Sequence, residues 1–384
     1  MIADKTIHIQ QKYIMLFLLL IPILQPKICT QYTIPTVLYA VMNLVEFAWL
    51  MKDRIRYGSF RLNKIIVAWI LIRLYILLLM ILNNTMADIL QWGYQSLMVI
   101  NLLLLFEHTK YSKYDIAKVV SILGASFLII NFCTLLAFPR GIIRSSFFDN
   151  PDNDWYFLGI KTQISTMMFP TLSAALYCFY KDNKKSLLII SIISCLINII
   201  YKSISTAWVG VGILVIMFLI RKLTKIKFSY LFLFCISLLI CILVVFFDFQ
   251  NYFSFIIVNL LGKDLTLSNR IYLWSRAVDI IFNSSILQIL FGHGQVVRFV
   301  PNAGSLWNPH NALLASLYNS GIIGTVAFYL FLYKLGNNKY YSSLQQGMMI
   351  IVFTLMVMSI TENYFEVAYV FVPFLLLRYA DDVV

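Results

Sequence analysis

The stretch FSYLFLFCISLLICILVVFFD, residues 228–248, carries no charged residue before its final aspartate. At about 1.5 Å of helical rise per residue, a run of this length crosses the roughly 30 Å hydrocarbon core of a bilayer. The rest of the chain has the same character, since 61% of its 384 residues are hydrophobic and its mean hydropathy is +0.82. So much apolar surface exceeds what a soluble core of this size holds. The sequence therefore predicts an integral membrane protein.

Eleven further apolar runs resemble this stretch in length and composition. They lie near residues 13–31, 33–51, 65–82, 86–106, 117–138, 162–180, 186–203, 204–220, 311–333, 346–361 and 364–379. We therefore expect an all-α protein with about twelve transmembrane helices, forming one polytopic domain over residues 1–384. The first run lacks a small-residue cleavage site, so we expect no cleaved signal peptide.

The distribution of Lys and Arg predicts how the helices are oriented. With the N-terminus inside, twenty of the thirty basic residues fall in inner segments, nine fall in outer segments, and Arg73 alone lies within a span. Because basic residues in short loops remain on the cytoplasmic side, we expect both termini in the cytoplasm. The net charge of +13 then reflects membrane topology and does not indicate a nucleic-acid partner.

Two outer segments are too long to be simple turns, namely residues 139–161 and 249–310. A long excursion among otherwise short loops usually has its own structure and function. Within the second, SNRIYLWSRAVDIIFN (268–283) predicts a short helix capped by Ser268 or Asn269. Its apolar stripe of Ile271, Trp274, Val278 and Ile281 would rest on the bundle or at the lipid interface. The turn FGHGQ (291–295) has glycines that let backbone amides approach an anion, although this short pattern is weakly specific.

The outer segment ends in WNPHNALLASLYNSGIIG, residues 307–324, where a histidine stands at the start of a membrane helix. Asn308 can cap this helix and Pro309 suits its first position. His310 and Asn311 then fall in the first turn, where the helix dipole disfavours a protonated imidazole. His310 is therefore expected to be neutral near pH 7 and able to accept a proton, or else simply to occupy the capping turn.

Four stretches resemble the superfamily of O-antigen polymerases and O-antigen ligases, which are bacterial envelope glycosyltransferases with a GT-C-like helical fold. They are FLGIKTQIS (157–165), SISTAWVGVGI (203–213), SNRIYLW (268–274) followed by FGHG, and PHNALLASLYNSGIIG (309–324). The last is the most specific, and together they cover the C-terminal two thirds of the chain. The N-terminal third resembles the superfamily only in its hydropathy.

The resemblance implies glycan transfer from a polyprenyl (undecaprenyl) diphosphate at the outer face of the bacterial plasma membrane, without cofactor or metal. We expect a polymerase that joins lipid-linked repeat units of a capsule, O-antigen or similar glycan, with such a lipid as both donor and acceptor. A chain-length regulator and a flippase are candidate partners. The alternatives are a ligase that moves a finished glycan to another acceptor and, from another class, a transporter or flippase. A transporter would be expected to show internal repeats and paired ionisable groups at the midplane, and neither is evident in the sequence.

The resemblance also assigns roles to two residues. His310 matches the superfamily histidine and would deprotonate the acceptor hydroxyl. Arg270 matches the motif arginine and would stabilise the diphosphate leaving group, although it could also be a solvated charge at a helix start.

Further residues are candidates for substrate binding. Many relatives have an arginine near Ser205, and its absence makes Lys202 a candidate second cation. Lys161 could meet phosphate or mark the interface, and Arg73 could contact phosphate or pair with Glu46. Asn311 orients His310 or caps its helix, and Glu362 binds sugar hydroxyls or caps a turn. Trp274 and Trp307 offer faces on which a sugar could stack.

We expect no metal site in this chain. The six cysteines form no CxxC pair and are expected to be buried apolar side chains. The acidic stretch DNPDND (149–154) lacks the glycine and distal glutamate of a calcium loop, so we interpret it as a polar loop.

Overall fold

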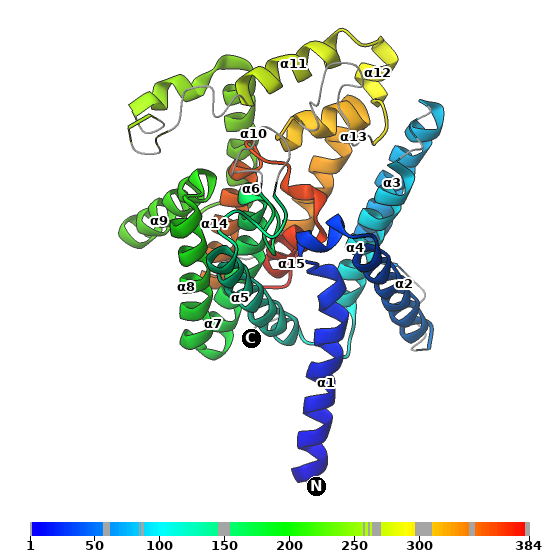
Figure 1. The fold of residues 1–384 in the computed structure, drawn as a ribbon, viewed down its shortest axis with the longest axis vertical. Coiled ribbons are helices and arrows are strands. Elements are labelled where there is room, and N and C mark those ends of the chain that lie inside the picture. The colour runs from blue at the N-terminus through cyan, green and yellow to red at the C-terminus, as the bar shows by residue number, and fades with distance from the viewer. Residues whose placement is uncertain are drawn as a thin grey trace.

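A computed structural model describes the chain apart from residues 1, 57–61, 84, 86–87, 145–153, 256–257, 260–261, 263–269, 296–308, 338–341 and 381–384, and apart from the side chains of residues 2–9. The described part is helical, with two isolated β-bridges and no strand (Figure 1). Its α-helices are α1 Ile2–Ile23, α2 Thr33–Arg56, α3 Lys64–Leu82, α4 Ile89–Glu107, α5 Lys113–Ala137, α6 Lys161–Ile164, α7 Met168–Asp182, α8 Lys185–Lys202, α9 Ser205–Thr224, α10 Tyr230–Phe247, α11 Arg270–Phe282, α12 Ile286–Phe291, α13 Ala312–Gly336, α14 Ser343–Met358 and α15 Val372–Arg378. Short 3-10 turns include η1 Lys27–Gln31, η4 Ser165–Met167, η5 Phe249–Phe253, η7 Tyr364–Glu366 and η8 Ala368–Phe371.

Each of the twelve predicted apolar runs contains helix, which confirms the all-α membrane fold. Among the described residues, eight helices are long and apolar enough to cross a bilayer: α2, α3, α4, α5, α8, α9, α10 and α13. Three shorter apolar helices cover Gln10–Ile23, Ser343–Met358 and Ala368–Arg378. The run 162–180 differs from a single span, because it is divided into α6, η4 and α7.

The core of the bundle is formed by its C-terminal helices. Nearly every residue of α14 and α15 is buried, and α14 packs against α7, α9 and α10 (Figure 1). The outer helices instead expose large aliphatic side chains, such as Leu71 on α3 and Ile216 on α9. A bilayer offers those side chains the apolar surroundings that water does not.

The segments predicted to be cytoplasmic meet at one end of the bundle. Arg54 of α2 forms an ion pair with Glu107 of α4 (3.1 Å), and the adjacent His108 lies 2.7 Å from Asp53. Further contacts at this end join Lys12 to Asp115, Tyr114 to Asp182, Arg221 to the Ser343 carbonyl and Arg378 to the Lys334 carbonyl. Loops that the basic residues predicted to share one side of the membrane therefore contact one another in the structure.

The segments predicted to be outside meet at the opposite end. The amide of Ile28 donates to the Phe157 carbonyl (3.2 Å), and Tyr156 donates to the Pro139 carbonyl (2.9 Å). Helices α11 and α12 lie across this end, and the N-terminus lies at the other (Figure 1). Trp274, Ala277 and Ile281 of α11 are buried against α10 and α13. The apolar stripe predicted for α11 thus rests on the bundle, whereas its predicted caps, Ser268 and Asn269, lie outside the described residues.

A break in α13 receives the turn that follows α12. Gly321 has φ 61° and ψ −170°, a conformation open essentially to glycine alone, and the same is true of Gly292 at φ 93° and ψ −178°. The two backbones touch there, and the amides of His293 and Gly294 donate to the carbonyls of Tyr318 and Asn319 (both 2.9 Å). These amides are therefore used within the fold. The prediction that backbone amides of FGHGQ approach an anion is therefore wrong for the amides of His293 and Gly294.

Replacing Gly321 by alanine should lower the free energy of unfolding by about 3 kcal/mol, because an added Cβ would be strained and would lie 2.4 Å from the Leu290 carbonyl oxygen. Gly212→Ala is the matched control, since a Cβ at that helical position meets nothing within 4 Å. Thermal unfolding of the purified protein in detergent measures both changes. An unchanged melting temperature for Gly321→Ala would contradict this account of the break.

The cysteines are partly as predicted. Cys178, Cys195 and Cys241 are buried and all six are free thiols. Cys133 and Cys235 are exposed on the outer faces of α5 and α10, so the expectation that all six are buried is wrong. An apolar thiol is tolerated on such a face because lipid surrounds it.

Candidate functional site

Three charged or ionisable side chains from distant parts of the chain meet at the outer end of the bundle. Glu362, in the turn after α14, accepts from both His310 and Arg270. Its Oε1 lies 2.9 Å from Nδ1 of His310, and its Oε2 lies 3.4 Å from a terminal nitrogen of Arg270. The sequence predicted a role for each of these residues, but it did not predict that Glu362 joins the other two.

The backbone around His310 holds this residue outside the helix. His310 has a left-handed conformation (φ 49°), and the following residue, Asn311, is extended and accepts from the Leu314 amide (2.9 Å). Asn311 is therefore the cap of α13, and Pro309 and His310 precede the helix. The predicted cap at Asn308, with His310 in the first turn, is wrong by three residues because His310 leaves the helical conformation.

Hydrogen bonds from the side chains of Trp274 and Asn311 hold the backbone around His310 in place. Trp274 is buried and its indole donates to the Pro309 carbonyl (2.9 Å), while the side-chain amide of Asn311 donates to the Ile360 carbonyl (2.8 Å). Asn311 is fully buried with both polar ends bonded, which confirms its capping role. The alternatives of substrate contact by Asn311 and sugar stacking by Trp274 are corrected, because neither side chain reaches a surface that substrate could touch. Trp307 lies outside the described residues.

The charge of Glu362 sets the protonation of His310. Burial alone would lower the pKa of His310, but the charge and the hydrogen bond of Glu362 outweigh it and raise the pKa above its ordinary value. Burial would likewise raise the pKa of Glu362, yet the charges of His310 and Arg270 hold it below its usual range. The helix dipole was expected to disfavour a protonated His310, and the contact with Glu362 acts in the opposite direction by raising the pKa of His310.

The contact with Glu362 fixes the neutral tautomer of His310. A carboxylate can only accept, so the hydrogen on Nδ1 points to Glu362 and, in the neutral ring, Nε2 carries the lone pair. The His310 side chain is 35% exposed, whereas that of Glu362 is 12% exposed. The pair can thus take a proton from a group that approaches from outside while the carboxylate remains sheltered.

Arg270 presents a donor that the described part of the protein does not use. Its Nε is buried and has no hydrogen-bond partner among the described residues, and its contact with Glu362 is long. A buried donor without a partner costs about 1–3 kcal/mol.

Lys27 is a cation near the site that the sequence did not single out. It begins η1, and its pKa is lowered by burial while the charges of Glu366 and Glu362 raise it. It therefore lies within electrostatic reach of both carboxylates. Nothing in the sequence around Lys27 indicates this, because the contact depends on how η1 packs.

The two other lysines behave differently from each other. Lys202 donates to the Tyr156 hydroxyl (2.6 Å) and lies over the same ring (4.5 Å to the centroid). It anchors the segment before α6 through Tyr156, and its role as the second diphosphate cation stays a prediction. Lys161 begins α6 and is half-buried, and the adjacent Thr162 lies close enough to Glu362 to lower the pKa of that carboxyl.

Arg73 is buried in α3 and contacts neutral groups. It donates to the Ser96 hydroxyl (2.6 Å), the Trp92 carbonyl (3.0 Å) and the side-chain oxygen of Gln295 (2.8 Å). The predicted pairing with Glu46 is therefore wrong. Gln295 follows the turn that docks on α13, so the break in that helix brings the amide to Arg73.

Within the described residues, no group of three His, Cys, Asp or Glu side chains could hold a metal ion. Most of the acidic stretch 149–154 lies outside those residues, and Asp154, which is described, forms an ion pair with Arg140 (3.3 Å).

Comparison with known proteins identifies the part of the chain that carries these features. Residues 189–329 match the family model described as O-antigen ligase, and this segment contains Arg270 and His310. No curated protein and no solved structure matches the chain. For residues 189–329, this match confirms the resemblance to the superfamily of O-antigen polymerases and ligases that the motifs indicated.

Proposed function

We propose that, within the glycan transfer of this superfamily, the chain is a polysaccharide polymerase. It joins polyprenyl diphosphate-linked repeat units at the outer face of the bacterial plasma membrane, and both termini are cytoplasmic. The observation that carries the proposal is the group formed by Arg270, Glu362 and His310 at the end of the bundle opposite the basic loops. By the distribution of positive charge, that end faces outward.

The proposed reaction transfers a glycan from a diphosphate to a hydroxyl. The bond between the donor's anomeric carbon and the phosphate oxygen breaks, and a bond from the same carbon to the acceptor oxygen forms. His310 accepts the acceptor's proton at Nε2, and Glu362 stabilises the imidazolium that results. Arg270 donates to the departing diphosphate through its guanidinium N–H groups. All of these steps use groups of the chain and the two substrates.

An apolar cavity in the bundle supports a lipid-linked substrate. It measures about 340 Å³, is almost entirely apolar, and is formed by α7, α8, α9 and α14. Ser165 and Met358 line its wall, and Ser165 also contacts the Tyr364 hydroxyl (2.8 Å), two residues after Glu362. An isoprenoid chain held in this cavity would place its diphosphate near the charged group.

An assay with the purified protein separates polymerase from ligase. The protein is reconstituted in lipid vesicles and supplied with polyprenyl diphosphate-linked repeat units, and products are resolved by gel electrophoresis. A ladder of longer lipid-linked glycans is expected. A single transfer to an added foreign acceptor, such as a lipid A core, with no ladder, would replace polymerase by ligase.

The pH dependence of the rate should reveal the pairing of His310 with Glu362. A general base works when neutral, so the rate should rise with pH through a pKa above the ordinary histidine value of about 6.5. Glu362→Gln removes the charge that raises this pKa, so the rising limb should move to lower pH and the plateau should fall. Initial rates of elongation from pH 5 to 9 measure both.

Asp279→Asn is the control for charge, because Asp279 is an exposed carboxylate further along α11 than Arg270. Its profile should match that of the unmodified protein. A profile for Glu362→Gln that rises at the same pH as before would show that His310 is not the titrating base.

A further inference from the structure

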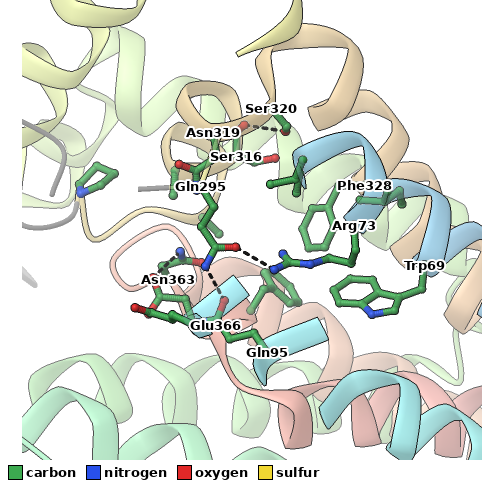
Figure 2. Close-up of a pocket in the computed structure, with 17 residues that line it drawn as sticks. Trp69, Arg73, Gln95, Gln295, Ser316, Asn319, Ser320, Phe328, Asn363 and Glu366 are labelled. Atoms are coloured by element: carbon green, nitrogen blue, oxygen red, sulfur yellow. Dashed lines mark hydrogen bonds between the residues drawn. The ribbon is translucent and has the colours of Figure 1, made fainter. Parts of the chain in front are cut away.

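A polar cavity of about 270 Å³ opens beside the charged group, between α3, α4, α13 and the turn η7. Its wall includes Pro309 and Asn363, which are the chain neighbours of His310 and Glu362. Its polar lining includes Arg73, Gln95, Gln295, Asn319, Asn363 and Glu366 (Figure 2). A molecule in this cavity would lie next to the proposed base.

The amides in the cavity are held in fixed orientations. Gln295 accepts from Arg73 (2.8 Å) and donates to the side-chain oxygen of Gln95 (2.9 Å), so it bridges the two, as Figure 2 shows. The Asn363 amide donates to Glu366 (3.0 Å). Because the guanidinium and these amides are already ordered, a ligand would meet a prepared surface at little further entropic cost.

The balance of charge in the cavity favours a neutral polar ligand. One guanidinium and one carboxylate, Arg73 and Glu366, share a lining that is otherwise made of neutral polar and apolar groups. Amides offer donors and acceptors side by side, which suits sugar hydroxyls because each hydroxyl both donates and accepts. A diphosphate would instead require several cations and would be repelled by the Glu366 carboxylate.

The size and the aromatic lining are consistent with a single sugar residue. The volume is near the lower end of the ~300–1000 Å³ of small-molecule sites, so it is too small for an extended glycan. Phe328 and Phe365 contact each other, at 5.6 Å between ring centroids, and both line the cavity. Their apolar surfaces can pack against the C–H face of a sugar ring.

We propose that this cavity is the subsite for the terminal sugar of the acceptor glycan, whose attacking hydroxyl it directs to His310. This inference rests on the proposed function for the identity of the acceptor. It adds Gln95, Gln295 and Asn319 to the site as positioning residues for the sugar. Asn319 and Gln295 stand in the stretches 309–324 and 291–295 that the sequence singled out, whereas Gln95 belongs to no such motif.

Binding, measured apart from turnover, tests the subsite. The variants Asn319→Ala and Gln95→Leu are made in a His310→Asn background that prevents elongation, and each protein is reconstituted in nanodiscs. Two radiolabelled probes are used: the polyprenyl diphosphate-linked repeat unit, and polyprenyl diphosphate without sugar. The control is Gln31→Leu, because Gln31 is exposed in η1 outside the cavity. The Asn319 side chain has no described hydrogen bond, so Asn319→Ala is the variant least expected to disturb folding.

Each cavity variant should weaken binding of the glycosylated lipid about 5- to 10-fold, the effect of losing one or two hydrogen bonds. Binding of the sugar-free lipid should not change, and Gln31→Leu should bind both probes normally. Equal weakening for both lipids would show that the cavity holds the diphosphate, and no weakening for either would show that the sugar lies elsewhere. Either result overturns the proposal. A chain that shows the expected binding but forms no ladder in the assay would contradict the polymerase function alone.

Discussion

His310→Asn is expected to reduce the rate of glycan elongation by about 10²- to 10⁴-fold, the usual contribution of a positioned general base. Asparagine is chosen because position 310 has a positive φ, a conformation that asparagine adopts more readily than most residues. The backbone should therefore keep its course, and the loss should fall on turnover with little change in KM. Initial rates with lipid-linked repeat units at saturating and limiting concentrations separate the two.

His108→Gln is the matched control for this loss. His108 pairs with Asp53 (2.7 Å) much as His310 pairs with Glu362, but at the opposite end of the bundle. The elongation rate of this variant should stay within about twofold of that of the unmodified protein, because His108 lies far from the proposed reaction. If His310→Asn retained most of its turnover while folding normally, His310 would not be the base.

Arg270→Gln is expected to lower the elongation rate by about 10²- to 10³-fold, comparable to removing a donor that stabilises charge in a transition state. Arg270→Lys should recover only part of the rate, because lysine retains the charge but lacks the planar fork of donors. Arg270→Gln should also change the pH dependence of the rate. Arg270 lowers the pKa of His310, so its loss should move the rising limb of the pH profile to higher pH, opposite to the effect of Glu362→Gln.

Arg276→Gln controls for loss of positive charge on the same helix. Arg276 lies further along α11 and contacts the Tyr272 hydroxyl at 3.5 Å, away from Glu362. Rates and pH profiles for this variant should match those of the unmodified protein. A loss at Arg276 as large as that at Arg270 would mean that the general charge of α11, and not the contact of Arg270 with substrate, governs the rate.

The fold could be predicted from sequence because a membrane imposes simple requirements on length and hydropathy. Runs such as 228–248 satisfy them without any knowledge of neighbours, and basic loops indicate their sides. The predicted spans are wrong where polar contacts, and not hydropathy, determine the backbone conformation. The segment 162–180 is divided into α6, η4 and α7, since its first part makes hydrogen bonds such as that between Ser165 and Tyr364 (2.8 Å).

The site could be predicted only where a local motif carries it. His310 and Arg270 stand in recognisable stretches, whereas the role of Glu362 depends on a turn fifty residues further on reaching both. The partner of Arg73 could not be predicted for the same reason. Gln295 reaches it through a turn docked on a broken helix, whereas the sequence suggested a phosphate or a pairing with Glu46.

The contact between Glu362 and His310 has a consequence for how substrate and protons interact. An anion that binds beside the imidazole raises its proton affinity, and by thermodynamic reciprocity a proton on the imidazole raises the affinity for the anion by the same factor. Capture of the lipid diphosphate should therefore be accompanied by proton uptake, and it should be tighter in mildly acidic surroundings. Attack by the acceptor requires the opposite state, so acidity outside the cell would favour occupancy while slowing each addition.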